Sequence, residues 1–437
     1  MLGLCLMVGE GFSQTISKMT LQSSYIRPGT QEASSGIWGW TSNTGKEYAL
    51  LTSRKPGGVS VVDISDPKTP KLIQFYPSGH NSVWFELNSS GNYVYMVSQE
   101  GTMGLFTLDM SPLNSATPGN PVALANNNSL FTNAHTIWID NTVTPAVMWV
   151  TPGMQSIAVF SLADPKKPAQ LAKFDPSGSS HDIFVRGNKC YHSTAGSTTN
   201  IWDVTNPAAK KDIATISGLA VAHNAWPTDD DKYLFTTEES VGRKVRSFDI
   251  SNPATPSEKN TWIGVTGVIA HNVYVQGKIL WVAHYSGGLW AVDISDPTNM
   301  KTLGYHRPST STATYGGTWG CYPYFKSGNI IHGDDEKGLM VVKPDFGSVG
   351  IDYGTGAAKF TISPLNSQEI EFQLPAAGEY ALSIFTPAGK QIFSRNATGT
   401  SGMQKLSVKA GGLANGNYVV KLNQASHIFS SPIVIRN

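Results

Sequence analysis

Histidines recur at regular intervals through much of this 437-residue chain. Each opens a similar short phrase, of which SHDIFV, AHNAWP and AHNVYV are clear copies, and successive members lie 55, 46, 42 and 48 residues apart. A neutral imidazole suits zinc, copper, iron or nickel, so several that meet at one point would form a metal site. The members of this series are His80, His135, His181, His223 and His271.

Further imidazoles and carboxylates occupy a second recurring place. They fall at or just after the end of the second apolar segment that follows an opening phrase. These additional candidates for binding a ligand or a metal are His284, His332, Glu100 and Glu238.

The apolar segments around these residues form a repeated unit. In its cleanest copy, residues 270–300, short apolar segments are separated by turn residues, and one more segment follows. This pattern predicts a four-stranded antiparallel meander, and its repetition every few tens of residues predicts a propeller. The third segment often ends in DISDP or DISNP, where the Asp or Asn can bond its own following backbone and the Pro fixes φ in a turn. With two copies that open without His, at residues 36–40 and 317–320, seven units are present.

The predicted topology places the candidate residues on one face. In each blade, the loop that enters the first strand and the loop between the second and third strands lie on the same side. The opening histidines and the four additional candidates are therefore expected around the mouth of the central channel. They could converge on a metal, copper or zinc, or form a polar rim that binds a ligand without metal. We favour a third interpretation, that each His staples its own blade, because recurrence once per blade suits a staple and a metal needs only about three or four ligands.

Two other features have structural interpretations. The aromatic residues that follow the opening histidines, among them Trp84, Trp138 and Trp226, are expected to fill the interfaces between adjacent blades. The acidic run at residues 229–231 is expected in a solvated turn on the opposite face, with calcium binding as the alternative.

The N-terminal region predicts how the ring closes. Residues 18–25 (KMTLQSSY) look like a fourth strand without a unit of its own, whereas the seventh unit supplies only three strands. We predict that this strand completes the last blade, which pairs both free edges. Before it, residues 1–14 resemble part of a secretory signal peptide, with an apolar run followed by small and polar residues.

The phrases VVDISDP and AVDISDP resemble those of the LVIVD-repeat proteins, including the group named choice-of-anchor. The resemblance covers about residues 35–344. It implies a seven-bladed β-propeller in an extracytoplasmic bacterial protein, and it implies no particular activity.

The sequence changes character after residue 344. Residues 345–358 are Gly-rich and predict a linker, and residues 359–437 alternate short apolar strands without any of the 11 tryptophans. The phrases Gly389-Lys390, Gly412-Leu413 and Gly416-Asn417-Tyr418 resemble the C-terminal sorting domain of the type IX secretion system. That resemblance implies a small β-sandwich that addresses the chain to an outer-membrane exporter. An ordinary accessory sandwich is the alternative.

Composition excludes several classes of function. The net charge of +1 provides no basic excess for nucleic acid, and no apolar run reaches the length of a transmembrane helix. The three cysteines, Cys5, Cys190 and Cys321, do not suggest a disulfide framework. We find no HExxH, no G-x-S-x-G and no phosphate-binding glycine loop.

The sequence thus predicts an all-β chain, a seven-bladed β-propeller over residues 15–344 followed by a small β-sandwich. We expect a secreted or cell-surface monomer that binds an extracellular protein or glycan and engages the type IX secretion machinery. The alternative function is a metal-dependent oxidase or hydrolase with a His-lined site at the channel mouth.

Overall fold

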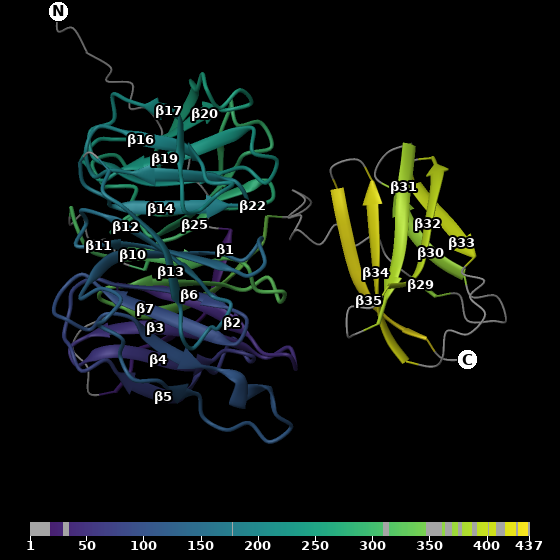
Figure 1. Cartoon of the computed structure of the whole chain (residues 1–437), viewed down its shortest axis with the longest axis horizontal. Helices are drawn as coiled ribbons and strands as arrows, with labels where there is room; N and C mark the ends of the chain where they lie inside the picture. The colour runs from purple at the N-terminus through teal and green to yellow at the C-terminus, as the bar shows by residue number, and fades with distance from the viewer. Residues whose placement is uncertain are drawn as a thin grey trace, which may run out of the picture. The chain divides into compact units, whose positions relative to one another are not determined.

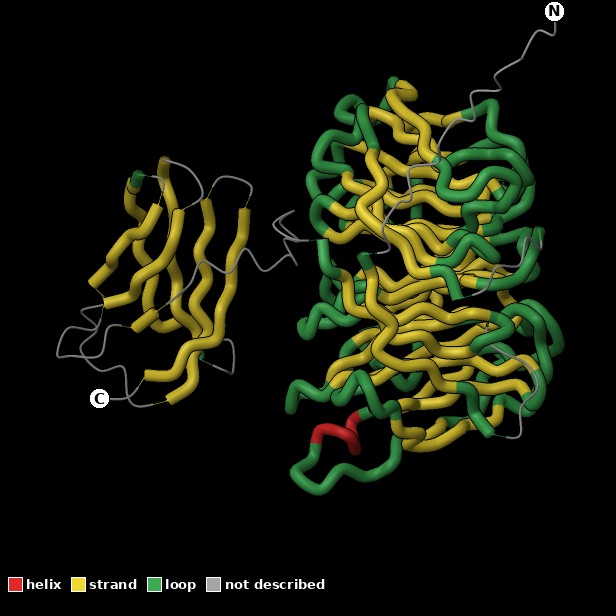
Figure 2. The backbone as a smooth tube through the Cα atoms, turned by 180° about the vertical axis from the view of Figure 1, so that it is seen from behind, coloured by secondary structure: helices red, strands yellow, loops and turns green. Residues whose placement is uncertain are grey.

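The computed structural model describes residues 18–28, 35–176, 178–308 and 314–346, together with most strands of the tail between residues 361 and 435. Figure 2 shows strands and loops almost throughout, with one short 3-10 helix, Ser111–Asn114, among the described residues. No helix in these described ranges is long and apolar enough to cross a membrane. The predicted signal peptide and nearly all of the predicted linker lie outside the described residues.

Residues 1–351 form one compact unit, which contains seven four-stranded antiparallel sheets. In Figure 1 these sheets lie face against face. We number them as blades 1 to 7 and give their strands in order from the first to the fourth. Blades 1 to 3 consist of β2 (Ile37–Thr41), β3 (Glu47–Arg54), β4 (Gly57–Asp63) and β5 (Lys71–Pro77); β6 (Phe85–Ser90), β7 (Tyr93–Ser98), β8 (Phe106–Asp109) and β9 (Val122–Ala123); and β10 (Ala134–Asp140), β11 (Val147–Pro152), β12 (Ile157–Ser161) and β13 (Ala169–Phe174).

The remaining four sheets follow the same order. They consist of β14 (Asp182–Arg186), β15 (Lys189–Ser193), β16 (Thr199–Asp203) and β17 (Lys211–Ile216); β18 (Ala222–Pro227), β19 (Tyr233–Glu238), β20 (Val245–Asp249) and β21 (Ser257–Trp262); β22 (Asn272–Gln276), β23 (Ile279–Ala283), β24 (Leu289–Asp293) and β25 (Lys301–His306); and β26 (Thr318–Tyr322), β27 (Ile330–Asp334), β28 (Gly338–Pro344) and β1 (Met19–Tyr25).

The first strands of the seven sheets contact one another in a closed circle. β2 contacts β6, β6 contacts β10, and the series continues through β14, β18, β22 and β26, which returns to β2. Seven four-stranded sheets in this cyclic order are consistent with the predicted seven-bladed propeller. The first strands line the axis, so residues near their starts from different blades can meet there.

The closing strand lies where the sequence predicts it. β1 pairs antiparallel with β28, with Met19 opposite Pro344 and Tyr25 opposite Leu339. Blade 7 therefore combines the N-terminal strand β1 with β26, β27 and β28. This pairing closes the ring of blades and covers the edge of β28.

The repeated phrases form the predicted turns after the third strands. Asp66 accepts the backbone N–H of Lys68 at 3.0 Å, and Asp296 accepts that of Thr298 at the same distance. These bonds hold the chain in a turn before it enters the fourth strand. Cys190 and Cys321 are both free and buried, as expected without a disulfide framework.

Residues 352–437 form a second compact unit. Its described strands make two antiparallel sheets. One consists of β29 (Thr361–Ile362), β30 (Glu369–Leu374) and β33 (Gly402–Ser407), and the other of β32 (Gln391–Gly399), β31 (Gly378–Phe385), β34 (Gly416–Gln424) and β35 (His427–Ile435). Phe372 from the first sheet lies 5.2 Å, ring to ring, from Tyr380 of the second.

Candidate functional site at the mouth of the channel

Four histidines from four consecutive blades form a continuous row of side chains whose rings contact one another at an angle. His135 and His223 belong to β10 and β18, while His181 and His271 immediately precede β14 and β22. The ring centroids of each neighbouring pair are 4.2 Å apart, and the row ends on the Trp319 indole of blade 7, at 4.6 Å from His271. All four side chains are buried, at 9% exposure or less. We call these four residues the histidine row.

Hydrogen bonds orient the two ends of the row. The Nδ1 atom of His271 lies 2.6 Å from the Trp319 carbonyl oxygen, which only accepts, so Nδ1 carries the proton. The Nδ1 atom of His135 lies 2.5 Å from the Gln99 side-chain oxygen and is a donor for the same reason. Both rings therefore have an unprotonated Nε2. The Nε2 atom of His135 lies 3.0 Å from that of His181.

Burial keeps the whole row neutral at pH 7. It lowers the pKa of His135 to about 4 and that of His271 to about 3. Burial, reinforced by the neighbouring rings, puts the pKa of His181 and of His223 well below the usual value. A neutral imidazole offers a lone pair, which is the form that binds a metal or accepts a hydrogen bond from a ligand.

Glu239 places a carboxylate beside the row. Its Oε2 atom lies 3.7 Å from the Nε2 atom of His223, and its Oε1 atom accepts the Tyr285 hydroxyl at 2.5 Å. Burial raises the Glu239 pKa, although the bond from Tyr285 opposes that rise. His181, His223 and Glu239 each offer one ligand atom, and these three atoms lie within 4.8 Å of one another.

A pocket of about 540 Å³ opens above the row. His135, His181 and Glu239 form part of its floor, and the walls combine aromatic, amide and charged side chains. Every blade contributes at least one lining residue, so the pocket lies over the axis of the ring. The other polar and aromatic side chains that line it are Arg54, Trp84, Gln99, Tyr285, Tyr315, Trp319 and Asp335.

A second, much smaller cavity of about 60 Å³ lies deeper in the channel, and His135, His181 and Trp319 line both spaces. Two of its lining carboxyl groups come from Glu86 and Asp182. Burial raises the pKa of Glu86 to about 8 and also raises that of Asp182. Glu86 accepts the Trp319 indole N–H at 3.2 Å, and Asp182 accepts the Asn224 amide at 2.6 Å.

Aromatic rings fill the channel next to this cavity. Trp226 of blade 5 lies 5.0 Å, ring to ring, from Trp138 of blade 3 and 4.5 Å from Phe184 of blade 4. Trp138 also reaches Trp38 of blade 1 at 6.4 Å. Contacts between blades that are not adjacent can only form across the axis. The prediction that Trp138 and Trp226 fill the interfaces between adjacent blades is therefore wrong, because these rings point into the channel instead.

The first opening histidine does not join the row. His80 lies five residues before its strand, which starts at Phe85, and its ring faces Gly101 of the same blade, where an added Cβ would lie 3.0 Å from Nδ1. For the same reason Trp84 lies at the wall of the large pocket and not among the aromatic rings that fill the channel. The structure thus does not bring His80 together with the other four, because the chain takes a longer path into blade 2.

Two predicted carboxylates have structural roles elsewhere. Glu100 is exposed and accepts the backbone N–H of Val83 at 2.8 Å, which braces the loop into its own blade. Glu238 is buried, accepts the Ala220 N–H at 2.5 Å and lies 3.6 Å from the Arg246 guanidinium. The residue after it, Glu239, lies beside the row, so the structure brings Glu239 and not Glu238 to the candidate site.

The histidines near the ends of the second strands are separate from the row. Asn200 donates to His192, which also contacts Ser180, and the backbone N–H of Val265 donates to His284. Nδ1 of the His306 ring lies 2.9 Å from Nε2 of His332, whose other nitrogen contacts Thr318 at 3.1 Å. The structure thus does not bring His284 or His332 into the candidate site; each belongs to a packed site of its own.

The sequence carries a signal for the polar residues that line the small cavity, although the predicted site did not include them. In the four blades of the row, the residue immediately after each histidine is polar, and all four of these residues line the small cavity: Thr136, Asp182, Asn224 and Asn272. The other site residues not singled out were Glu86, Gln99, Tyr285 and Glu239. Gln99, Tyr285 and Glu239 occupy the recurring place just after the second strands of their blades, where the sequence marks Glu100, His284 and Glu238. Glu86 lies within β6 and belongs to no shared phrase, so the sequence offered no signal for it.

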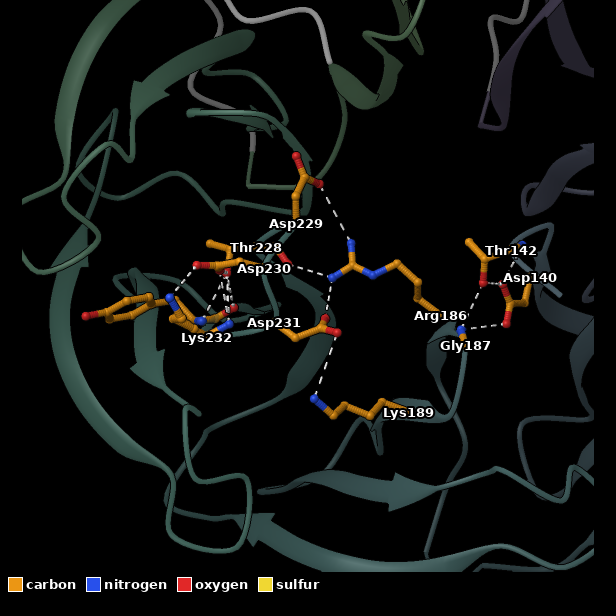
Figure 3. Close-up of polar contacts among 11 residues, drawn as sticks. Asp140, Thr142, Arg186, Gly187, Lys189, Thr228, Asp229, Asp230, Asp231 and Lys232 are labelled. Atoms are coloured by element: carbon orange, nitrogen blue, oxygen red, sulfur yellow. Dashed lines mark hydrogen bonds and ion pairs between the residues drawn. The ribbon is translucent and has the colours of Figure 1, made fainter. Parts of the chain in front are cut away.

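The acidic run on the other side of the blades is paired with cations. Arg186 of blade 4 contacts both Asp229, at 3.7 Å, and Asp231 of blade 5, and Lys189 lies 3.8 Å from Asp231 (Figure 3). Asp230 accepts the Thr228 hydroxyl at 2.7 Å within the turn. The run is thus the exposed turn that the sequence predicts, with Asp229 63% and Asp230 55% exposed, and its ion pairs also join two blades.

Comparison with known protein families identifies a repeat in three of these blades. The LVIVD repeat family matches residues 54–77, 248–262 and 267–305, which lie in blades 1, 5 and 6. The chain carries LVIVD repeats. This repeat is associated with β-propellers, in agreement with the seven sheets. No curated protein matches the sequence. The LVIVD matches cover strands on which the fold depends and leave out three members of the histidine row, His135, His181 and His223.

The raised pKa of Glu86 leads to a pH-dependent prediction. Between the unfolded value near 4.5 and the folded value of about 8, the folded chain holds a proton that the unfolded chain has lost, so this group lowers stability as the pH rises. Asp182 raises this pKa further, and the Trp319 N–H lowers it. Glu86→Gln keeps the acceptor for Trp319 and removes the titration. We expect urea unfolding to show the variant gaining about 2–4 kcal/mol over the wild type between pH 5 and pH 8.

Glu100→Gln is the control for this measurement, because Glu100 is exposed. Glu100→Gln should not show the gain over the wild type between pH 5 and pH 8 that Glu86→Gln shows. If the Glu86→Gln and wild-type curves also run parallel from pH 5 to pH 8, then Glu86 is ionised in the folded chain and the proposed environment of the small cavity is wrong.

Proposed function

We propose that the LVIVD-repeat unit is a binding module that takes a small hydroxylated ligand, such as the end of a glycan, in the pocket above the histidine row. The single observation that carries this proposal is the pocket of about 540 Å³ lined from all seven blades. Its volume falls in the range of small-molecule sites, and a concave site of this kind suits a ligand of one or two sugar rings better than a flat protein surface.

The chemistry of the lining supports a hydroxylated ligand. Trp84, Tyr285 and Trp319 offer aromatic surface for the apolar face of a ring. Glu239 and Asp335 offer carboxylate oxygens that accept hydroxyl protons, and neutral histidines add further hydrogen-bonding atoms. Asp335 lies 3.7 Å from Arg54, so the pocket holds no strong net charge that would favour an ionic ligand.

A fluorescence titration with a panel of neutral mono- and disaccharides tests this proposal. We expect at least one sugar to change the tryptophan emission with saturable binding, and Trp84→Ala to weaken that binding at least tenfold. Tyr93→Ala removes an aromatic side chain that does not line the pocket and should bind as the wild type does. The proposal fails if no sugar in the panel binds, or if Trp84→Ala and Tyr93→Ala bind equally well.

We also propose that the module is exported, with residues 1–14 as part of a signal peptide and residues 359–437 as a type IX sorting domain. The motifs of the tail support this assignment, and the two antiparallel sheets of residues 352–437 suit a small β-sandwich. In a host with that secretion system, deletion of residues 359–437 should leave the protein in the periplasm. Equal amounts of intact and shortened chain outside the cell would contradict the assignment.

A further inference from the structure

The histidine row contains an arrangement of lone pairs that hydrogen bonds alone do not explain. The Nε2 atom of His135 is unprotonated, because its Nδ1 proton goes to Gln99. If His181 donates to it across the 3.0 Å contact, the Nδ1 atom of His181 is left with a lone pair. That buried nitrogen has no hydrogen-bond partner. If His181 does not donate, two lone pairs face each other at 3.0 Å.

His223 shows the same deficiency. Its Nδ1 atom is also buried without a hydrogen-bond partner, although the ring lies beside the backbone of His271. Its Nε2 atom faces Glu239 at 3.7 Å, which is beyond hydrogen-bond distance. A buried polar atom without a partner costs free energy, so two in one cluster need an explanation.

We propose that this cluster is a binding site for one divalent transition metal ion of the zinc and copper class, held by His181, His223 and Glu239 with His135 at its edge. Imidazole nitrogen and carboxylate oxygen are ligands of such ions. Two ligand atoms that each lie about 2.0–2.1 Å from a tetrahedral ion are roughly 3.3 Å apart. Among the three proposed ligands, His223 and Glu239 already lie 3.7 Å apart, and all three ligand atoms lie within 4.8 Å of one another, so the side chains must close by at most about 1.5 Å to bind an ion.

Neighbouring groups orient His135 and Glu239. A histidine in a metal site usually donates its other ring N–H to an oxygen atom, as His135, at the edge of the site, does to Gln99. Glu239 receives the Tyr285 hydroxyl on the oxygen that does not face His223, which fixes the orientation of the carboxylate. Because His181 and Glu239 also line the large pocket, the ion would have a coordination position open to it. The inference does not depend on which organic ligand, if any, the pocket binds.

Isothermal titration of the full chain with Zn²⁺, and separately with Cu²⁺, tests the site. The protein is purified without a His tag and dialysed against a chelator, and Ca²⁺ serves as the control ion. We expect one Zn²⁺ or Cu²⁺ per chain and no Ca²⁺. His181→Gln and His223→Gln should each weaken binding at least a hundredfold, and Glu239→Gln at least tenfold.

Two matched variants separate ligation from folding. Glu238→Gln alters the adjacent carboxylate, which is paired with Arg246, and His192→Gln alters an equally buried histidine held by Ser180. Both should bind the ion as the wild type does, and thermal melts of the metal-free variants establish that each is folded. The inference is overturned if no variant or wild-type chain binds either ion, or if all variants bind equally.

These outcomes are distinguishable from a failure of the proposed ligand binding. Sugar binding that survives the loss of the metal would leave the pocket assigned and the metal site rejected. Metal binding without any sugar would do the reverse, and it would turn the search toward ligands that coordinate an ion.

Discussion

Removing the N-terminal strand is expected to prevent cooperative folding of the propeller. β1 (Met19–Tyr25) supplies the fourth strand of blade 7 and pairs with β28 along its length. Without it, β28 presents a row of unpaired backbone groups at an open edge, which favours aggregation. The buried cluster around Met19, which includes Trp281 and Phe346, would also open to water. A chain that lacks residues 1–26 should therefore show a broad thermal transition and oligomers in size-exclusion chromatography.

A point substitution tests the same contact without shortening the chain. Met19 is 4% exposed, so Met19→Ala should lower the free energy of unfolding by about 2–4 kcal/mol. Leu21 belongs to the same strand but is 46% exposed, and Leu21→Ala should cost less than about 1 kcal/mol. Urea unfolding of the two variants measures the difference. Equal losses, or wild-type behaviour of the chain without residues 1–26, would show that β1 does not close the ring.

The second large effect is expected at the centre of the channel. Trp226 is buried and contacts the rings of Trp138, Phe184, Tyr274 and Tyr324, which come from four other blades. Replacing it with alanine leaves a large cavity on the axis, where no single blade can move to fill it. We expect Trp226→Ala to lower the free energy of unfolding by about 3–5 kcal/mol, measured by circular dichroism in urea.

Tyr315→Ala is the control for the channel. Tyr315 is also a large aromatic residue, but its side chain is 62% exposed at the rim of the pocket. Its loss should change stability by no more than about 0.5 kcal/mol. A cost below about 1 kcal/mol for Trp226→Ala would mean that the channel collapses freely and that the aromatic rings do not form a rigid plug.

The sequence could predict the repeat and its closure because both depend on local patterns. Each blade carries its own apolar segments, and five of the seven have an Asx turn after the third strand, such as that of Asp66, so the meander is encoded many times over. Residues 18–25 formed a predicted strand without a unit of its own, and the seventh unit lacked a fourth strand. Together these two features predicted that β1 pairs with β28.

The sequence could not predict equally well which side chains reach the axis of the ring. His80 has the same opening phrase as the row, but the length of chain between it and Phe85 removes it from the channel mouth. Glu238 and Glu239 are adjacent, and neighbouring residues along an extended chain point to opposite sides. Which of the two faces the row depends on where β19 ends, and that is set by the packing of the blade. The channel rings were misplaced for a similar reason, since apolar spacing does not distinguish the axis from an interface between blades.

Anomalous diffraction at the zinc absorption edge, from crystals grown with Zn²⁺, tests most directly whether the buried histidines of adjacent blades form a binding centre at the channel mouth. A single strong peak is predicted within bonding distance of His181, His223 and Glu239, on the floor of the pocket. Its disappearance in His223→Gln crystals of the same form would support the assignment. A map without a peak there, or with a peak only elsewhere, such as at the acidic turn of residues 229–231, would contradict it.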